Sequence, residues 1–326
     1  MITPKYNIRI EKYDAAKQSE WDNFVAESNN GTMFHLQSFL QYHPAERFEF
    51  SNYMFYDGTE LVAVLPGGYK ENGRVYWSPV GASYGSLVTG DIHFDLSLAV
   101  VDAMLEMFRS NGTEELFLIP PPFIYNTKYS QNIEYAMLYR KFDFEYHYIS
   151  HSLELAEDNT QYYNRATKFK FNKIHKNKDL LVEINNDYEN FYPILVKNKL
   201  KHNATPTHSL EELYRLDALL PNRLQLFMCY YKDEPIGGHL LFLPNANVSL
   251  CFYNAMYYEY DKQFPAYALA EKVIEWSKAH NYRWFDFGVS QDTTSDDPMA
   301  PSISLIQFKE SLHTRGIFRS TYHLSL

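Results

Sequence analysis

The chain has 326 residues, a length typical of about two domains. Its 40 acidic residues outnumber its 30 basic residues and give a formal net charge of −10, which argues against a protein whose whole surface binds DNA. No apolar stretch reaches the length of about 18 residues that a membrane-spanning helix needs, and Met1–Ile10 lacks the pattern of a signal peptide. We therefore expect a cytoplasmic protein without a transmembrane segment.

A unit of three strands, a helix and a fourth strand is predicted twice along the chain. The three strands begin at Tyr53 in the first copy and at Phe227 in the second, and turn residues separate them. In each helix that follows, apolar residues recur every three or four positions, as expected for a helix with one buried face. The predicted helices and the strands after them are 95–110 with 115–119, and 265–280 with 283–287. Since every element recurs in the same order, we expect two homologous α+β domains.

The segment between the two copies contains the strongest local charge of the chain. Residues 165–178 include Arg165, Lys168 and Lys173 among six basic residues, and no acidic residue occurs before Asp179. In a chain of negative net charge, such a cluster favours an anionic partner such as a phosphate group, because charge-assisted bonds to phosphate need Lys or Arg. A solvated helix face explains the charge pattern equally well.

Two further helices and a last strand complete the predicted elements. The helices are expected at 187–201 and 209–219, and Ser209 with Glu212 forms a capping-box pattern at the start of the second. Residues 317–326 alternate in the manner of a strand. This strand is a candidate to return to the first domain.

The sequence Gly81-Ala82-Ser83-Tyr84-Gly85 matches the G-x-S-x-G pattern of a serine hydrolase. That motif needs a helix directly after it, so that the serine lies exposed on a strained turn. Here residues 86–91 contain β-branched residues, a glycine and an acid before any helix can start. We therefore favour a turn that needs small residues over a nucleophile at Ser83.

The triplet Asp286-Phe287-Gly288 imitates a protein-kinase motif, but the other kinase motifs are missing. The place of this triplet in the predicted fold is more informative than its match to the kinase motif. Asp286 and Gly288 lie where a strand ends after a helix, which is where open α/β sheets bind ligands. A turn built from Asp and Gly is the alternative interpretation.

The cysteines and histidines predict no metal site. Cys229 and Cys251 lie in apolar runs that predict strands, show no C-x-x-C spacing, and are expected to be buried, inert thiols. The twelve histidines include no H-x-H or H-E-x-x-H pair. We therefore expect no functional metal ion.

Five stretches carry a resemblance to a known family. They are Ser78-Pro79 followed by residues 84–88, the basic run 165–184, residues 206–216, residues 286–288, and residues 305–312 with their Phe-Lys pair. In this order and spacing, the chain resembles the Fem-type (FemAB/FemX-like) peptidoglycan bridge-forming aminoacyltransferases of the Gcn5-related N-acyltransferase (GNAT) superfamily, from about Trp21 to the C-terminus.

The resemblance implies the α+β fold class, with two tandem GNAT-like domains. Each would contain a mixed, largely antiparallel sheet flanked by helices. The expected domains are 1–153 and 154–312, with the strand 313–326 returning to the first.

The resemblance also implies an amide-forming acyltransferase without a tightly bound cofactor. The acceptor would be an amine of a cell-wall precursor or nucleotide-linked glycan. This acceptor would be anionic and phosphate-bearing, and either a small molecule or linked to a lipid. The donor would be aminoacyl-tRNA or acyl-CoA. Phe308 and Lys309 match the family's Phe-Lys pair beside the reacting carbonyl, where Lys309 would stabilise the oxyanion. Arg165, Lys168 and Lys173 would face a phosphate or the donor, and Tyr253 would line the acceptor groove. Asp286 and Gly288 would lie beside the substrate.

Two alternatives remain open at this point. An acetyl-CoA-dependent N-acetyltransferase in polysaccharide biosynthesis is disfavoured, because residues 261–266 lack the glycines of the usual pyrophosphate-binding loop. A non-catalytic GNAT-fold binding protein would show a filled groove in the second domain, with Lys309 turned to solvent.

Overall fold

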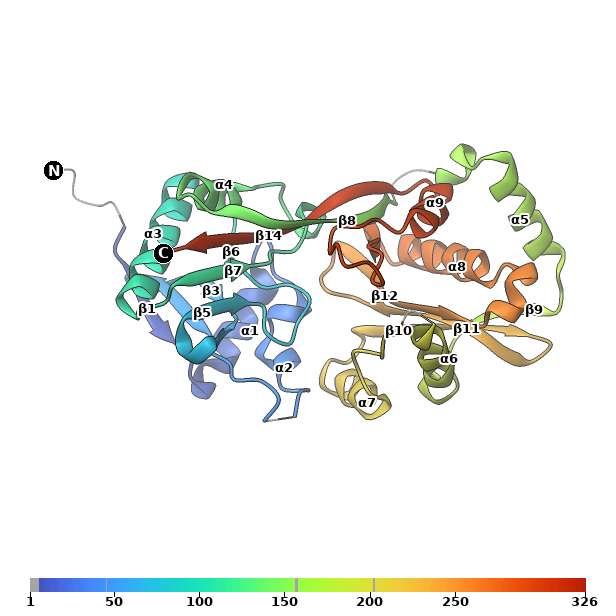
Figure 1. Ribbon diagram of the computed structural model, residues 1–326, viewed down its shortest axis with the longest axis horizontal. Coiled ribbons are helices and arrows are strands. Elements are labelled where there is room, and N and C mark those ends of the chain that lie inside the picture. The colour runs from blue at the N-terminus through green and yellow to red at the C-terminus, as the bar shows by residue number, and fades with distance from the viewer. Residues whose placement is uncertain (1–5, 45, 156–157, 202) are drawn as a thin grey trace. The chain divides into compact units, whose positions relative to one another are not determined.

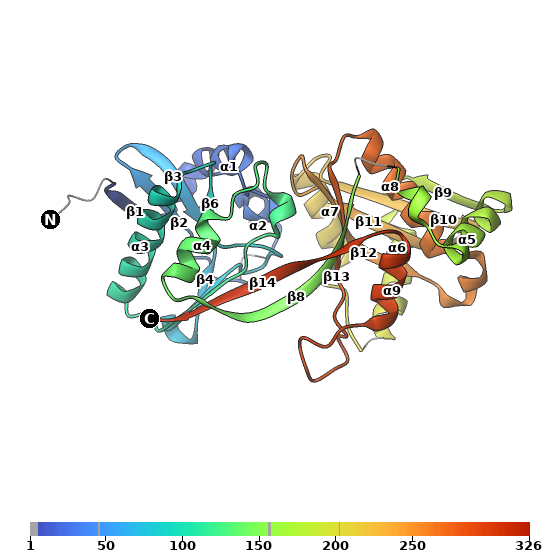
Figure 2. The same ribbon diagram turned by 90° about the horizontal axis from the view of Figure 1, so that it is seen from above.

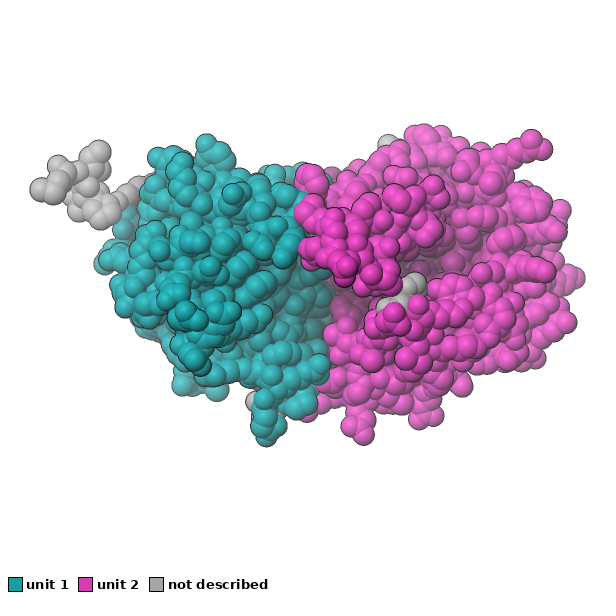
Figure 3. Space-filling view, viewed as in Figure 1, with its two compact units in different colours: residues 1–147, 319–326 teal, residues 148–318 magenta. Residues whose placement is uncertain are grey.

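The computed structural model describes residues 6–44, 46–155, 158–201 and 203–326. The chain forms two compact units, residues 1–147 with 319–326 (unit 1) and residues 148–318 (unit 2), shown in Figure 3. The chain passes from one unit to the other within two long strands, β8 (Asp143–Glu154) and β14 (Arg315–Ser325).

Unit 1 contains two groups of strands. The first has the antiparallel order β1-β2-β3-β6, and in the second β5 pairs in parallel with β7, while β4 and β14 pair antiparallel with β5 and β7. The strands are β1 (Ile8–Lys12), β2 (Tyr53–Asp57), β3 (Glu60–Leu65), β4 (Gly68–Lys70), β5 (Val75–Ser78), β6 (Val88–Thr89) and β7 (Glu115–Leu118). The helices are α1 (Gln18–Glu27), α2 (Gln37–Leu40), α3 (Phe94–Ser110) and α4 (Asn132–Tyr139).

Helix α3 forms because its apolar residues make one continuous stripe. Successive members of the stripe Val101, Met104, Leu105 and Phe108 are one or three positions apart, and they are buried against β2, β3, β5 and β7. The helix ends at Asn111–Gly112, as predicted, and Gly112 has a φ of +73°. Helices α3 and α4 lie side by side (Figure 1 and Figure 2) and share this core, while α1 packs on the opposite face of the four-stranded sheet.

The described residues of unit 2 form a sheet in the order β8-β13-β12-β11-β10-β9, and among these strands only the β12–β13 pair is parallel. The strands are β9 (Leu180–Ile184), β10 (Leu224–Tyr231), β11 (Glu234–Phe242), β12 (Val248–Met256) and β13 (Trp284–Val289). The helices are α5 (Arg165–Lys176), α6 (Tyr188–Leu200), α7 (Leu210–Leu219), α8 (Pro265–Ala279) and α9 (Ile303–Ser311). Short 3-10 helices occupy Ala15–Lys17, Met33–His35, Glu71–Gly73, Phe123–Tyr125, Asn159–Tyr162 and Tyr258–Gln263 of the chain.

The sheet of unit 2 is covered on both faces. In Figure 1, α5, α8 and α9 lie on one side of it and α6 and α7 on the other. Phe227, Cys251 and Phe285 of the sheet are buried with Leu269 and Val273 of α8. On the opposite face α6 approaches closely, because a Cβ at Gly238 would lie 2.6 Å from the ring of Phe191.

The predicted duplication and fold class are confirmed. In both units a strand precedes a long helix and pairs in parallel with the strand after it, as β5, α3 and β7 in unit 1 and β12, α8 and β13 in unit 2. The predicted helices around 187–201 and 209–219 are α6 and α7, and the capping box of Ser209 and Glu212 is present. Within the described ranges, no helix combines the length and the hydropathy that a bilayer-spanning segment needs.

Candidate functional site

The two parallel strands of unit 2 separate before they end. Residues 248–250 of β12 pair with 284–286 of β13, and no further pair joins the two strands in the described part of the chain. Beyond this point β12 stays paired with β11 as far as Met256, whereas β13 stays with β8 as far as Val289. The facing edges of β12 and β13 therefore carry main-chain groups that the sheet does not use, and we call this place the strand fork (residues 251–256 and 287–289).

Asp286 and Gly288 shape the fork. The register of β13 against β8 shifts between Asp286 and Val289, and Gly288 takes a φ of +72°, which favours glycine. The buried Asp286 carboxylate holds this bulge, because its Oδ1 accepts from the Gly288 N–H at 2.7 Å and from the Ser150 hydroxyl at 2.8 Å. Asp286 and Gly288 thus form a turn, as the alternative interpretation of the motif expected, and this turn lies at the strand fork.

Lys309 lies buried at the same place. It extends from α9 with 3% of its surface exposed. Its Nζ donates to the main-chain oxygens of Gly288 (2.8 Å) and Val289 (2.9 Å) and to the Ser290 hydroxyl (2.9 Å). These three acceptors match the three protons of an ammonium group. Burial lowers the pKa of Lys309 to about 8, although the charge of Asp286 opposes this shift.

Ser290 and His151 extend this arrangement, and our sequence reasoning missed both. Ser290 Oγ accepts from Lys309, so its own proton is available for His151 Nδ1, 2.9 Å away. Burial first, and then the charge of Lys309, lowers the pKa of His151 to about 4, so the imidazole is neutral at neutral pH. Ser290 follows the Asp286–Gly288 motif by two residues, which was the only signal in the sequence; His151 had none.

Phe308, the neighbour of Lys309 in α9, packs against Tyr267, and Tyr267 in turn contacts the basic helix α5. Its ring lies edge-on to Tyr267 of α8, with 5.1 Å between the centroids. The Tyr267 hydroxyl accepts from Lys170 Nζ of α5 at 2.6 Å and lies 3.1 Å from Ser311 Oγ of α9. Lys170 is therefore the basic residue of α5 that reaches toward the site.

Arg165, Lys168 and Lys173 lie elsewhere, on the exposed face of α5. The helix starts there because the Asn164 side chain caps it, and it is anchored through the buried Thr167 and Phe171. The remaining face is basic and includes Phe169, which is 56% exposed. The structure thus brings Lys309, Phe308, Asp286 and Gly288 together, and it places the three predicted cations on an outer helix face.

Tyr253 lies on β12 within the fork segment but is buried. Its hydroxyl accepts from the main-chain N–H of His208 at 3.1 Å and lies 2.9 Å from His208 Nδ1. Burial raises the pKa of Tyr253 to about 12. Lys199 Nζ lies 5.9 Å from the centre of the Tyr253 ring, and burial lowers the pKa of this lysine. A role for Tyr253 in lining an acceptor groove stays a prediction.

Ser83 does not lie on a nucleophile elbow. The segment 81–85 is followed by the strand β6 rather than by a helix. Small residues are needed there, because a Cβ at Gly85 would lie 2.5 Å from Pro79 N and one at Gly81 would lie 2.6 Å from His43 Nε2. The described residues also contain no cluster of three His, Cys, Asp or Glu side chains suited to a metal ion.

Comparison with known proteins places this geometry in context. The model of the FemAB family matches residues 130–315, which is more than half of the chain. A comparison with curated protein sequences found no match. Three similar solved structures show the same fold across both units, a FemX, the C-terminal domain (DUF2156) of a putative lysylphosphatidylglycerol synthetase from Agrobacterium fabrum, and a tandem GNAT protein from the clavulanic acid biosynthesis pathway.

Their TM-scores are 0.69, 0.61 and 0.55, at sequence identities of 13%, 9% and 8%. The matches cover 97%, 95% and 98% of this chain, and 97%, 92% and 98% of those chains. The tandem GNAT-like fold and the family resemblance predicted from the sequence are confirmed.

Proposed function

This chain belongs to the FemAB family and is an acyltransferase, and from that premise we propose that it forms an amide bond on a cell-wall precursor or a nucleotide-linked glycan. An aminoacyl or acyl group would pass from an activated donor to an amine of that acceptor. The observation that carries the proposal is the buried ammonium group of Lys309 at the strand fork. The alternative of a non-catalytic binding protein predicted that Lys309 would be turned to solvent, whereas Lys309 is buried.

In the proposed step, the acceptor nitrogen attacks the carbonyl carbon of the donor and a C–N bond forms. The electron pair of the C=O bond moves to the oxygen, and the C–O or C–S bond to the leaving group breaks when the intermediate collapses. The amine proton leaves through a neighbouring acid or water, and the leaving group departs protonated. The chain's own contribution is charge stabilisation at the oxyanion.

Lys309 can supply this charge only by exchanging a partner. All three of its protons are donated to Gly288 O, Val289 O and Ser290 Oγ. An oxyanion is a stronger acceptor for an ammonium group than a neutral carbonyl, because the attraction between two opposite charges is added to the hydrogen bond. We therefore propose that the developing oxyanion replaces one of the two main-chain oxygens, while Ser290 retains its bond.

A direct transfer fits the site better than a covalent intermediate on cysteine. Cys251 lies on β12 at the fork, where Lys309 and Asp286 both affect its titration. Burial nevertheless raises the pKa of Cys251 to about 12, so the thiol stays protonated at neutral pH and is a weak nucleophile.

The start of α8 favours an aminoacyl-tRNA donor over acetyl-CoA. Pro265 at the first helical position has no N–H, and the N–H groups of Tyr267 and Ala268 are bonded to Phe264 O at 3.1 Å each. Within residues 264–268, the N–H of Ala266 is therefore the one that could bind the pyrophosphate of acetyl-CoA. Nucleotide sites at helix N-termini hold a pyrophosphate with several N–H groups. The exposed cations of α5 would contact the phosphates of the donor or of the acceptor.

The proposal is tested with the purified full-length chain and mass spectrometry. The chain is incubated with a mixture of aminoacyl-tRNAs and a UDP-linked muropeptide, and the expected result is an acceptor heavier by one aminoacyl residue. Calorimetry with CoA is the second arm, with no binding expected. Micromolar CoA binding together with acetylation of the acceptor would show that the donor is acetyl-CoA and not aminoacyl-tRNA. Absence of transfer from either donor would overturn the proposed function.

A further inference from the structure

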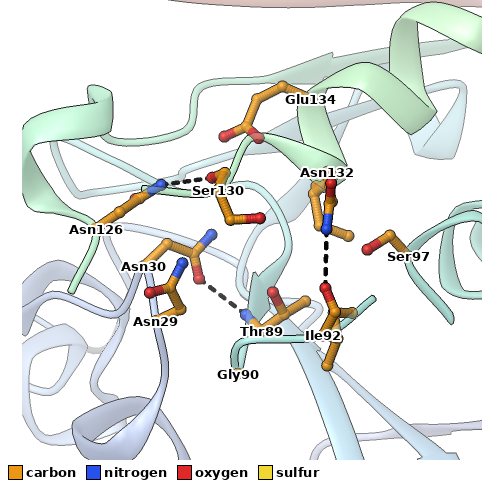
Figure 4. A pocket seen from close by; sticks show the side chains of 11 residues that line it. Asn29, Asn30, Thr89, Gly90, Ile92, Ser97, Asn126, Ser130, Asn132 and Glu134 are labelled. Carbon is orange, nitrogen blue, oxygen red and sulfur yellow. Dashed lines mark hydrogen bonds between the residues drawn. The ribbon is translucent and has the colours of Figure 1, made fainter. Parts of the chain in front are cut away.

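Unit 1 contains a small polar pocket that the proposed function does not use. It lies where the starts of α3 and α4 meet the end of β6, and Figure 4 shows it from close by. Its cavity volume of about 10 Å³ accommodates one particle of the size of a water molecule. The polar groups around it include Thr89, Ser97, Ser130, Asn126, Asn132 and Glu134.

Oxygen atoms dominate what this pocket offers to an occupant. The carboxamide nitrogen of Asn126 donates to Ser130 O at 2.8 Å, and that of Asn132 donates to Ile92 O at 3.0 Å. The Ser97 hydroxyl donates to His93 O at 3.1 Å. Asn29 Oδ1 and Asn30 Oδ1 already accept from the main-chain N–H groups of Lys128 and Thr89, at 2.7 and 2.8 Å. The acceptors that the pocket offers to an occupant are therefore the hydroxyl oxygens, Asn132 Oδ1 and the Glu134 carboxylate.

Glu134 is the only carboxylate among the residues that line this pocket. It is the third residue of α4, and Figure 4 shows its carboxylate turned toward the side of the pocket formed by Ser130 and Asn126. Burial raises the pKa of Glu134 to about 7, and its own backbone N–H is the one group that opposes this shift. No hydrogen bond from another described residue reaches the carboxylate.

The charged and titratable groups around Glu134 do not neutralise it. Tyr322 of β14 faces it, and burial together with the charge of Glu134 raises the pKa of this tyrosine. Lys128, the nearby cation of the loop before α4, is paired with Asp91 at 2.9 Å and has a side chain 70% exposed. The pocket therefore has one negative charge at alkaline pH and no cation of its own among these groups.

We propose that the Glu134 pocket binds one monovalent cation of about the size of a water molecule, with K⁺ and NH₄⁺ as the chemical class. Hard cations prefer carboxylate, carbonyl and hydroxyl oxygens, which is what surrounds the cavity. A single carboxylate balances a single positive charge, whereas a protein site for Ca²⁺ usually draws on several carboxylates. A bound cation would tie the start of α4 to α3 and β6 and thereby stabilise unit 1.

Thermal unfolding of the full chain tests the site. The probes are KCl and NH₄Cl compared with tetramethylammonium chloride, whose cation is too large for the cavity, at equal ionic strength. The folded chain binds the Glu134 proton more tightly than the unfolded chain, so the stability from this group is complete below about pH 4.5 and is lost as pH rises to about 7. At pH 8 we therefore expect K⁺ and NH₄⁺ to raise Tm by about 2–4 °C over tetramethylammonium. At pH 5 the difference should disappear.

Two variants and a structure complete the test. Glu134→Gln should abolish the cation effect at pH 8, while Glu60→Gln, which changes an exposed carboxylate of the same unit, should retain it. Crystals grown with Tl⁺ should show an anomalous peak in the pocket. Equal Tm values in KCl and tetramethylammonium chloride at pH 8, or an undiminished cation effect in Glu134→Gln, would show that the pocket holds only water and would overturn the proposal.

Discussion

Lys309 and Ser290 are joined by a hydrogen bond of 2.9 Å between two fully packed side chains, one from a helix and one from the loop that follows β13. The bond fixes the direction of the ammonium group, because the other two protons of Lys309 then fall on Gly288 O and Val289 O. The position of the Lys309 charge is thus determined by the main chain at the end of β13. It does not depend on a flexible surface side chain.

Replacement of Lys309 by methionine should remove the charge while keeping most of the side-chain volume. We expect transfer to fall by about 10²–10³-fold, the usual cost of losing an oxyanion-stabilising group. The measurement is single-turnover transfer at saturating donor. Lys262→Met, which changes an exposed lysine just before α8, is the control and should leave the rate unchanged. An unchanged rate in Lys309→Met would end the proposed role of this residue.

Replacement of Ser290 by alanine should leave the lysine charged but less well directed. The ammonium loses one acceptor and His151 Nδ1 loses its partner, so we expect a lower kcat with little change in KM. Ser249→Ala, which deletes a buried hydroxyl on β12 that bonds to Ser277 at 2.8 Å, controls for the loss of packing. Equal losses of kcat in the two variants would mean that Ser290 acts through stability alone.

The rate of transfer should fall as pH rises through about 8, because Lys309 then loses its charge. The same shift has a consequence for stability. Between about pH 8 and 10.5 the unfolded chain binds more protons at this lysine than the folded chain, so this residue makes the free energy of unfolding rise with pH. A pH–rate profile of kcat checks the first statement. In Lys309→Arg the alkaline decline should move to higher pH, and a decline at the same pH would assign it to another group.

Replacement of Gly288 by alanine should strain the bulge. A Cβ there would meet Cys251 O at 3.8 Å, which is ordinary contact, so the cost comes from the φ of +72° and amounts to about 1–2 kcal/mol. Urea unfolding measures it. Gly90→Ala, at a glycine without positive φ and with open space around it, should cost less. Because Gly288 O also accepts from Lys309, we expect the rate of transfer to decline as well.

Removal of the exposed charges of α5 should weaken binding more than chemistry. We expect the triple variant Arg165→Ala, Lys168→Ala, Lys173→Ala to raise KM for the phosphate-bearing partner and to reduce its salt dependence, with kcat within about twofold. The matched triple variant Lys12→Ala, Lys70→Ala, Arg109→Ala removes three exposed cations of unit 1. If the two triples behaved alike, the face of α5 would be only a solvated surface.

Local patterns in the sequence were sufficient for much of the fold. The stripe Leu98, Val101, Leu105 and Phe108 predicted α3, and the turn at Asn111–Gly112 predicted its end, because both depend on neighbours a few residues away. The duplicated order of elements was visible for the same reason. The separation of β12 from β13 was not visible, because it depends on the pairing of each strand with a different neighbour.

The site was predicted in part for comparable reasons. Two short motifs, residues 286–288 and 308–309, led us to predict Lys309, Asp286 and Gly288, and the fold brings these residues together, while their roles stay predictions. His151 lies far away in the chain, and its contact with Ser290 arises only when β8 pairs with β13. The basic run predicted a charged segment correctly, but helical geometry decides which lysine turns inward, and that residue is Lys170.

The saturation of Lys309 has a consequence for the durability of such an enzyme. A primary amine beside an activated ester is itself a substrate for acylation, and a lysine acylated at this position would lose its charge for good. The nitrogen has no lone pair with which to attack while it is protonated, and the three acceptors favour this protonated form against the burial that lowers its pKa to about 8. The contacts that hold the ammonium group at the end of β13 would thus also protect Lys309, as long as it is charged, from acylation by the donor.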